Sequence, residues 1–144
     1  MTCSFQRLIK RVTGAAIALC LGLCLMLAPM GLSVEASGAL MSGDYINDTV
    51  SVASSLQETI AIPKEEVGRS DSEDEAVQLI TAYISRYRNR SQVNKSLSYT
   101  TMQTALNSMA GHYKTFPNRV LPDRLKDRLN NELAKASELA TKES

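Results

Sequence analysis

The sequence predicts an all-α protein, an up-down-up-down antiparallel four-helix bundle that follows an N-terminal signal segment. Three observations support this prediction. Apolar residues recur at spacings of three and four in four segments, which is the period of one helix face. Short polar or Pro-containing stretches separate these segments, and the expected helices are similar in length. Helices of matched length joined by short connections pack as antiparallel neighbours.

Residues 1–36 are expected to form an export signal, either a cleaved signal peptide or a retained signal-anchor. The bases Arg7, Lys10 and Arg11 precede an apolar run over residues 14–28, which is short for a membrane span of about 20 residues. The sequence Val34-Glu35-Ala36 has the small-x-small pattern that signal peptidase recognises. We therefore expect cleavage after Ala36 if the segment is removed.

All three Cys residues, Cys3, Cys20 and Cys24, fall within the signal segment. The rest of the chain therefore has no thiol chemistry and no disulfide framework. A bacterial lipobox places a small residue directly before its Cys, whereas Leu19 and Leu23 stand in those places. No lipidation site is identified on this pattern.

Residues 37–43 are small and polar and are expected to form a flexible tether to the bundle, residues 44–144. The first helix is expected over about residues 44–60. Ser42 or Asp44 can cap its start, and Pro63 enforces its end. Its expected apolar face comprises Ile46, Val50, Ala53, Leu56 and Ile60.

The second helix is expected over about residues 71–89. Ser70 with Glu73, or Ser72 with Glu75, has the spacing of a capping box. Acidic residues cluster in its first turn and Arg residues in its last, which suits the helix dipole at both ends. Its expected apolar face comprises Ala76, Val77, Ile80, Tyr83, Ile84 and Tyr87.

The third and fourth helices are expected over about residues 97–114 and 122–141. Ser96 or Ser98 begins the third helix, and Pro122 occupies a favoured first helical position in the fourth. The apolar face of the third comprises Tyr99, Met102, Leu106, Met109, Ala110 and Tyr113. The apolar face of the fourth comprises Leu125, Leu129, Leu133, Ala136 and Ala140, with Leu139 beside it.

The composition excludes several function classes. Without residues 1–36 the chain carries a net charge of −1, which argues against a nucleic-acid binder. His112 is the only His, so no His-rich metal site is expected, and the acidic run over residues 71–75 has Ala76 where a calcium loop needs Gly. We expect no metal and no cofactor. A small helical binding protein is favoured over an enzyme whose site combines scattered acids with His112.

The run from Thr100 to Pro122 carries a family resemblance. The sequence TMQTALNSMAGHY is followed by PNR and by a Pro before the last helix. Together with Asp48-Thr49, Leu56 and residues 60–63, it resembles the small lumenal photosystem II assembly and repair proteins, the Psb twenty-seven family. The resemblance extends over about residues 43–140.

The resemblance implies a four-helix bundle in the thylakoid lumen without enzyme activity. Family members bind transiently to photosystem II subunits in immature or damaged complexes, chiefly at the lumenal loop of the CP forty-three inner antenna protein. They keep the site of the manganese–calcium cluster accessible until assembly is complete. Cyanobacterial members carry a lipobox Cys before the first helix, whereas this chain has Ala36-Ser37. The residues therefore favour a cleaved soluble form or a retained signal-anchor at the membrane over a lipoprotein.

The residues after the third helix are the expected partner-binding site. We expect a monomer that presents Tyr113, Phe116, Pro117, Asn118 and Arg119 to a protein surface, with Phe116 as an anchor and Arg119 paired with a carboxylate. Alternatively, Tyr113 and Phe116 close the end of the core.

A second basic group contains Arg86 and Arg90, near Arg88 and Lys95. It is expected either to be a solvated helix end or to contact an acidic protein loop or anionic lipid. The alternative function is a membrane-tethered periplasmic helical binding protein unrelated to photosynthesis.

Overall fold

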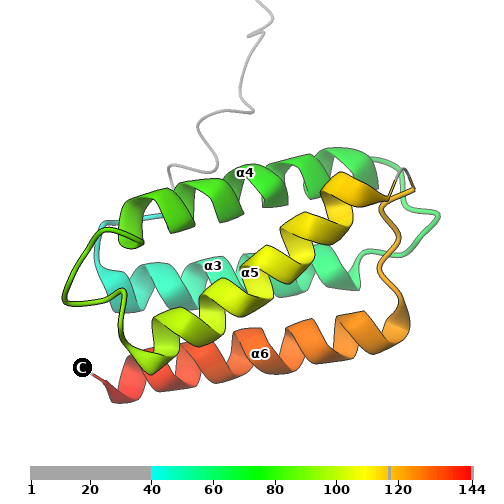
Figure 1. Ribbon diagram of the computed structural model, residues 1–144. Coiled ribbons are helices and arrows are strands. Elements are labelled where there is room, and N and C mark those ends of the chain that lie inside the picture. The colour runs from blue at the N-terminus through cyan, green and yellow to red at the C-terminus, as the bar shows by residue number, and fades with distance from the viewer. Residues whose placement is uncertain (1–39, 117, 144) are drawn as a thin grey trace, which may run out of the picture. The chain divides into compact units, whose positions relative to one another are not determined.

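The fold is an all-α four-helix bundle, as predicted. The computed structural model describes residues 40–116 and 118–143, and within these ranges the only regular elements are helices. They are α3 (Tyr45–Ala61), α4 (Arg69–Tyr87), α5 (Leu97–Thr115) and α6 (Asp123–Lys142). Successive helices run in opposite directions, and α3 packs against both α4 and α6 (Figure 1). The expected signal segment, with Ala36 and the three Cys residues, lies outside the described residues.

Two of the helix caps considered from the sequence, Asp44 and Ser96, are confirmed. The Asp44 carboxylate accepts a 2.9 Å hydrogen bond from the Asn47 N–H at the start of α3. The Ser96 hydroxyl accepts a 3.1 Å bond from the Tyr99 N–H at the start of α5. Pro122 lies just before the first residue of α6 rather than within it.

Both capping boxes predicted for α4 are wrong. The helix begins at Arg69, after Gly68, whose φ of 86° lies in the left-handed region that glycine readily adopts. Glu73 therefore lies one turn inside the helix, where it pairs with Arg69 instead of capping the helix start. The helix also ends at Tyr87, before the expected residue 89.

The core is made mainly of the predicted apolar faces, with one clear error in α3. Val52 is completely buried, whereas Val50, which we expected in the core, is 42% exposed. The α3 face that packs inward instead includes two polar residues, Asp48 and Thr49, which are 1% and 0% exposed. Polar residues are thus part of the interior, and their hydrogen-bond partners decide where this helix lies.

Residues 41–43 do not behave as a flexible tether. Met41 is buried against the core, and the backbone N–H groups of Ser42 and Gly43 donate to the Asp48 carboxylate. The chain is therefore fixed to the bundle before α3 begins. None of the described helices is both long and apolar enough to cross a membrane.

Candidate functional site

The start of α4 and the connection from α5 to α6 meet at one end of the bundle, which we call the Arg69 end (Figure 1). Arg69 joins the two segments. Its Nη1 donates to Glu73 Oε1 over 2.7 Å, and its Nη2 donates to the Asn118 carbonyl oxygen over 3.1 Å. One guanidinium thus binds a buried carboxylate and the backbone of the connection together.

A second ion pair lies beside the first. The Arg119 guanidinium bonds to the Asp74 carboxylate, and these side chains are 31% and 54% exposed. Arg119 has a φ of 51°, the only positive φ of a non-glycine residue among the described residues. A left-handed conformation costs a residue with a Cβ about 1 kcal/mol. The surrounding contacts therefore hold Arg119 in a conformation that it would not adopt alone.

His112 supports the connection from the α5 side. Its Nε2 lies 2.9 Å from the Val120 carbonyl oxygen, which can only accept, so Nε2 carries the hydrogen. Its ring lies 4.5 Å from the Phe116 ring, with 30° between the ring planes. His112 is thus a hydrogen-bonded boundary residue. Among residues 40–116 and 118–143, no group of His, Cys, Asp and Glu could hold a metal ion.

The predicted contact residues divide into buried and exposed ones. Tyr113 is only 3% exposed, and burial raises the pKa of its hydroxyl. It belongs to the core and cannot be offered to a partner. Phe116 is 50% exposed, and Asn118 is exposed beside it, while Arg119 is partly exposed. Pro117 lies outside the described residues.

Arg86 and Arg90 do not join this site. Both lie near the other end of α4, and Arg86 is roughly 25 Å from Arg69 at 1.5 Å per helical residue. Arg90 Nη1 donates to the Gly43 carbonyl oxygen over 3.2 Å, and its guanidinium carbon lies 4.7 Å from the centre of the Tyr87 ring. Arg86 Nη1 is 3.9 Å from Asp48 Oδ2. Both arginines therefore have contacts within the chain.

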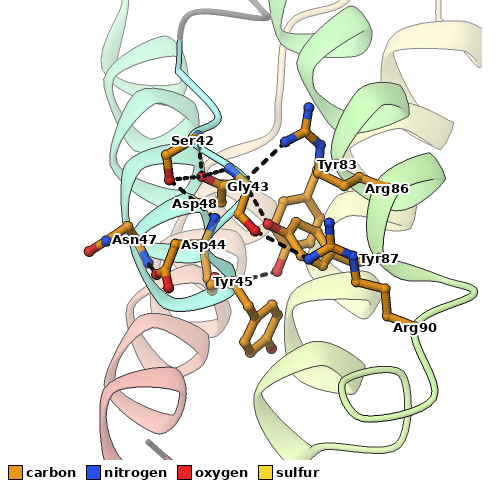
Figure 2. Close-up of polar contacts among 11 residues, drawn as sticks. Ser42, Gly43, Asp44, Tyr45, Asn47, Asp48, Tyr83, Arg86, Tyr87 and Arg90 are labelled. Carbon is orange, nitrogen blue, oxygen red and sulfur yellow. Dashed lines mark hydrogen bonds and ion pairs between the residues drawn. The ribbon is translucent and has the colours of Figure 1, made fainter.

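Asp48 is the centre of this second polar cluster (Figure 2). Its carboxylate accepts hydrogen bonds from the Ser42 N–H at 2.6 Å, from the Ser42 hydroxyl at 2.9 Å and from the Tyr87 hydroxyl at 2.6 Å. The Gly43 N–H adds a bond of 3.1 Å. These bonds join α3, α4 and the segment before α3.

The pKa of Asp48 reflects the balance between burial and these bonds. Burial alone would raise the pKa, but hydrogen bonds from Tyr87, Ser42 and Gly43 outweigh it and hold the pKa of Asp48 below its ordinary value. Sequence reasoning noted Asp48-Thr49 only as part of a resemblance and missed this role. An acid one helical turn past an N-cap, with a Ser and a Gly before that cap, was the available signal.

The pKa of Glu73, at the Arg69 end, is shifted in the opposite direction to that of Asp48. Glu73 is 4% exposed, and burial raises the pKa of its carboxyl group, although the positive charge of Arg69 opposes this shift. Sequence reasoning assigned Glu73 to a helix cap and missed its burial. The structure thus provides an exposed aromatic ring, two guanidinium groups and one poorly solvated carboxylate within a single end of the bundle.

Comparison with known proteins gives consistent matches. The family described as Photosystem II Pbs27 matches residues 7–139. The Photosystem II lipoprotein Psb27 of Synechocystis sp. is 41% identical over 112 residues, which cover 78% of this chain and 84% of that protein. The Photosystem II repair protein PSB27-H1 of Arabidopsis thaliana is 27% identical over 100 residues, covering 69% of this chain and 58% of that protein.

Solved structures match the fold as well. The solution structure of Psb27 from cyanobacterial photosystem II has a TM-score of 0.71 and 37% identity, and the match covers 81% of this chain and all of that one. The crystal structure of PSB27 from Arabidopsis thaliana has a TM-score of 0.66 and 26% identity, covering 69% and 98%.

Proposed function

Because this chain belongs to the photosystem II Pbs27 family, we propose that it is a non-catalytic assembly factor that binds immature or damaged photosystem II. The observation that carries the proposal is the family match over residues 7–139, which reaches from before α3 into α6. Relatives are named as a photosystem II assembly factor and a photosystem II repair protein. The periplasmic alternative unrelated to photosynthesis has no support from these matches.

The proposed place of action is the thylakoid lumen, at the lumenal face of the thylakoid membrane. There the chain acts as a monomer and assists biogenesis or repair of the oxygen-evolving manganese–calcium cluster. It does so without a cofactor of its own, by occupying a protein surface until assembly is complete. Its recipient is the lumenal loop of the CP forty-three inner antenna protein.

The contact surface that we propose consists of Phe116, Asn118 and Arg119 at the Arg69 end. Phe116 offers a half-exposed aromatic ring whose other side is supported by His112. Aromatic residues, Phe among them, and Arg are enriched in protein interfaces relative to the rest of the surface. The bond between His112 Nε2 and the Val120 carbonyl oxygen holds the connection before binding, which lowers the entropy cost of association.

Affinity capture from solubilised thylakoid membranes tests the function. The tagged full-length chain is expected to retain photosystem II subunits, including the inner antenna protein, and to retain more of them from cells recovering from photodamage. Val50→Ser is a matched control, because Val50 is an exposed apolar residue of α3 away from the Arg69 end. Absence of photosystem II subunits from the captured material would show that the proposal is wrong.

A further inference from the structure

Glu73 is a buried acid at the Arg69 end, and Arg69 joins it to the proposed contact surface. Its carboxylate is 2.7 Å from Arg69, the residue that also binds the Asn118 carbonyl oxygen. The next residue, Asp74, holds Arg119 in the same way at the surface. Glu73 and Asp74 thus already pair with the two guanidinium groups that an acidic partner would bind.

We propose that Glu73 takes up a proton when an acidic partner segment binds at Arg69 and Arg119, so that binding tightens as the pH falls. This inference rests on the proposed function, because it concerns the same contact surface. The partner segment carries carboxylate groups. Glu73 competes with these carboxylates for Arg69.

The charges around Glu73 favour an acidic partner. Titratable and charged groups approach it from α4, from both connections and from two further helices. They are Arg69, Asp74, His112, Tyr113, Arg119, Lys64 and Lys126. Cations outnumber acids in this set, so a carboxylate from outside is attracted to it. Complementary charge of this kind sets partner choice and orientation.

Competition links the proton to the partner. When a partner carboxylate draws Arg69 outward, Glu73 loses its counter-charge while it stays buried. An unpaired buried carboxylate is strongly disfavoured and becomes protonated instead. By thermodynamic reciprocity, a proton that is taken up on binding also strengthens binding. A partner carboxylate that stayed farther away would act in the same direction, because like charges disfavour ionisation.

The burial of Glu73 favours uptake of a proton on binding. Burial already raises the pKa of Glu73 in the free protein, and loss of the positive charge of Arg69 would raise it further. An acid whose pKa is raised by folding stabilises the folded state when it is protonated, and that contribution is lost as the pH rises through its pKa. Protonation of Glu73 therefore leaves the bundle intact, and the effect falls on the contact surface.

The test compares the pH dependence of binding in two proteins. Photosystem II complexes solubilised from thylakoid membranes of cells recovering from photodamage are immobilised, and the Kd of the full-length chain and of Glu73→Gln is measured from pH 7.5 to pH 5.0. The ratio of the two Kd values cancels the titration of the partner's own groups. We expect Glu73→Gln to bind more tightly at pH 7.5 and the ratio to approach one at low pH. One linked proton changes the Kd by at most about tenfold per pH unit.

Two control variants identify the titrating group. Asp74→Asn removes the exposed acid and is expected to tighten binding while keeping the pH dependence of the unaltered chain. His112→Gln removes the only His and is expected to keep that dependence too. If His112→Gln abolishes the pH dependence while Glu73→Gln keeps it, the proposal is overturned.

Calorimetry of the unaltered chain provides a measurement that needs no variant to fold. Binding heats at pH 6 in two buffers with different ionisation enthalpies report the protons taken up, and we expect net uptake. No uptake, or a constant ratio of Kd values across the pH range, overturns the proposal. If the unaltered chain does not bind photosystem II at any pH, the proposed function fails instead, so the two failures are distinct.

Discussion

The hydroxyl of Tyr87 donates a 2.6 Å hydrogen bond to the carboxylate of Asp48, 39 residues earlier in the chain. This bond joins the last turn of α4 to the first turn of α3 in the interior of the bundle (Figure 2). The same carboxylate binds the backbone of Ser42 and Gly43. One acid therefore sets the relative position of two helices and of the segment that precedes them.

Replacing Asp48 with Asn should destabilise the bundle strongly. The amide cannot accept all the bonds that converge on the carboxylate, and a buried donor would face the N–H groups of Ser42 and Gly43. Loss of a buried, hydrogen-bonded charge costs about 3 kcal/mol. Urea unfolding followed by circular dichroism measures the free energy of unfolding. Asp127→Asn, at an exposed position of α6, is the matched control; a loss as small as the control's would contradict the role of Asp48.

The pH dependence of stability should also report Asp48. Its pKa is lower in the folded chain than the ordinary value of 3.8, so the unfolded chain binds protons more readily. The stabilisation is present above the ordinary pKa and is lost as the pH falls through the lowered value. Urea midpoints from pH 5 to pH 2 should therefore fall less steeply in Asp48→Asn. Parallel curves would show that Asp48 does not contribute to acid unfolding.

Arg119→Gly should separate binding from stability. Glycine adopts a φ of 51° without strain, which offsets the loss of a partly exposed ion pair worth at most about 1 kcal/mol. The melting temperature should therefore change little, while capture of photosystem II subunits should fall. Arg119→Lys keeps the charge but not the two parallel donors, and we expect intermediate binding. Undiminished capture by Arg119→Gly would remove Arg119 from the contact surface.

Phe116→Ala should mainly weaken binding, whereas Tyr113→Ala should mainly lower stability. Tyr113 is buried, and truncation of a buried aromatic residue costs about 3 kcal/mol or more. Phe116 is half exposed, so its truncation should cost little stability but should reduce association with photosystem II. Thermal unfolding and affinity capture of both variants check this pair. A large loss of stability in Phe116→Ala would instead make it part of the core.

The fold could be predicted because it depends on local and repetitive signals. Apolar residues at helical spacing, short connections and Ser or Asp caps are all readable from a few neighbouring residues, and Leu56, Met102 and Leu129 are buried as their spacing indicates. The error at Val50 has a physical cause. A stripe of apolar residues was assumed to mark the buried face of α3, whereas Asp48 and Thr49 occupy part of that face.

The polar sites could not be predicted in the same way. Glu73 and Asp48 carry charged side chains. From sequence alone, such a side chain is predicted to be exposed unless its partners can be identified. The partners of Asp48 come from residues 42–43 and from Tyr87, and the Arg69 bond to Asn118 spans 49 residues. Only the tertiary arrangement brings such groups together. Pro, Asn and Arg after a helix mark a connection, and Phe116 is exposed and Arg119 partly exposed there; their contact with a partner stays a prediction.

A last polar contact lies where α6 ends. The Glu143 carboxylate accepts hydrogen bonds from the backbone N–H groups of Leu97 and Ser98 at 3.2 and 3.3 Å, and it also bonds to the Ser98 hydroxyl. During synthesis on the ribosome, α5 emerges well before Glu143, so its first turn is made without this acceptor. The N–H groups of Leu97 and Ser98 gain this acceptor only after α6 has emerged and folded back, whereas Ser96 caps the Tyr99 N–H from the outset. The α5–α6 hairpin should therefore be the last part of the bundle to become protected from hydrogen exchange in a growing chain.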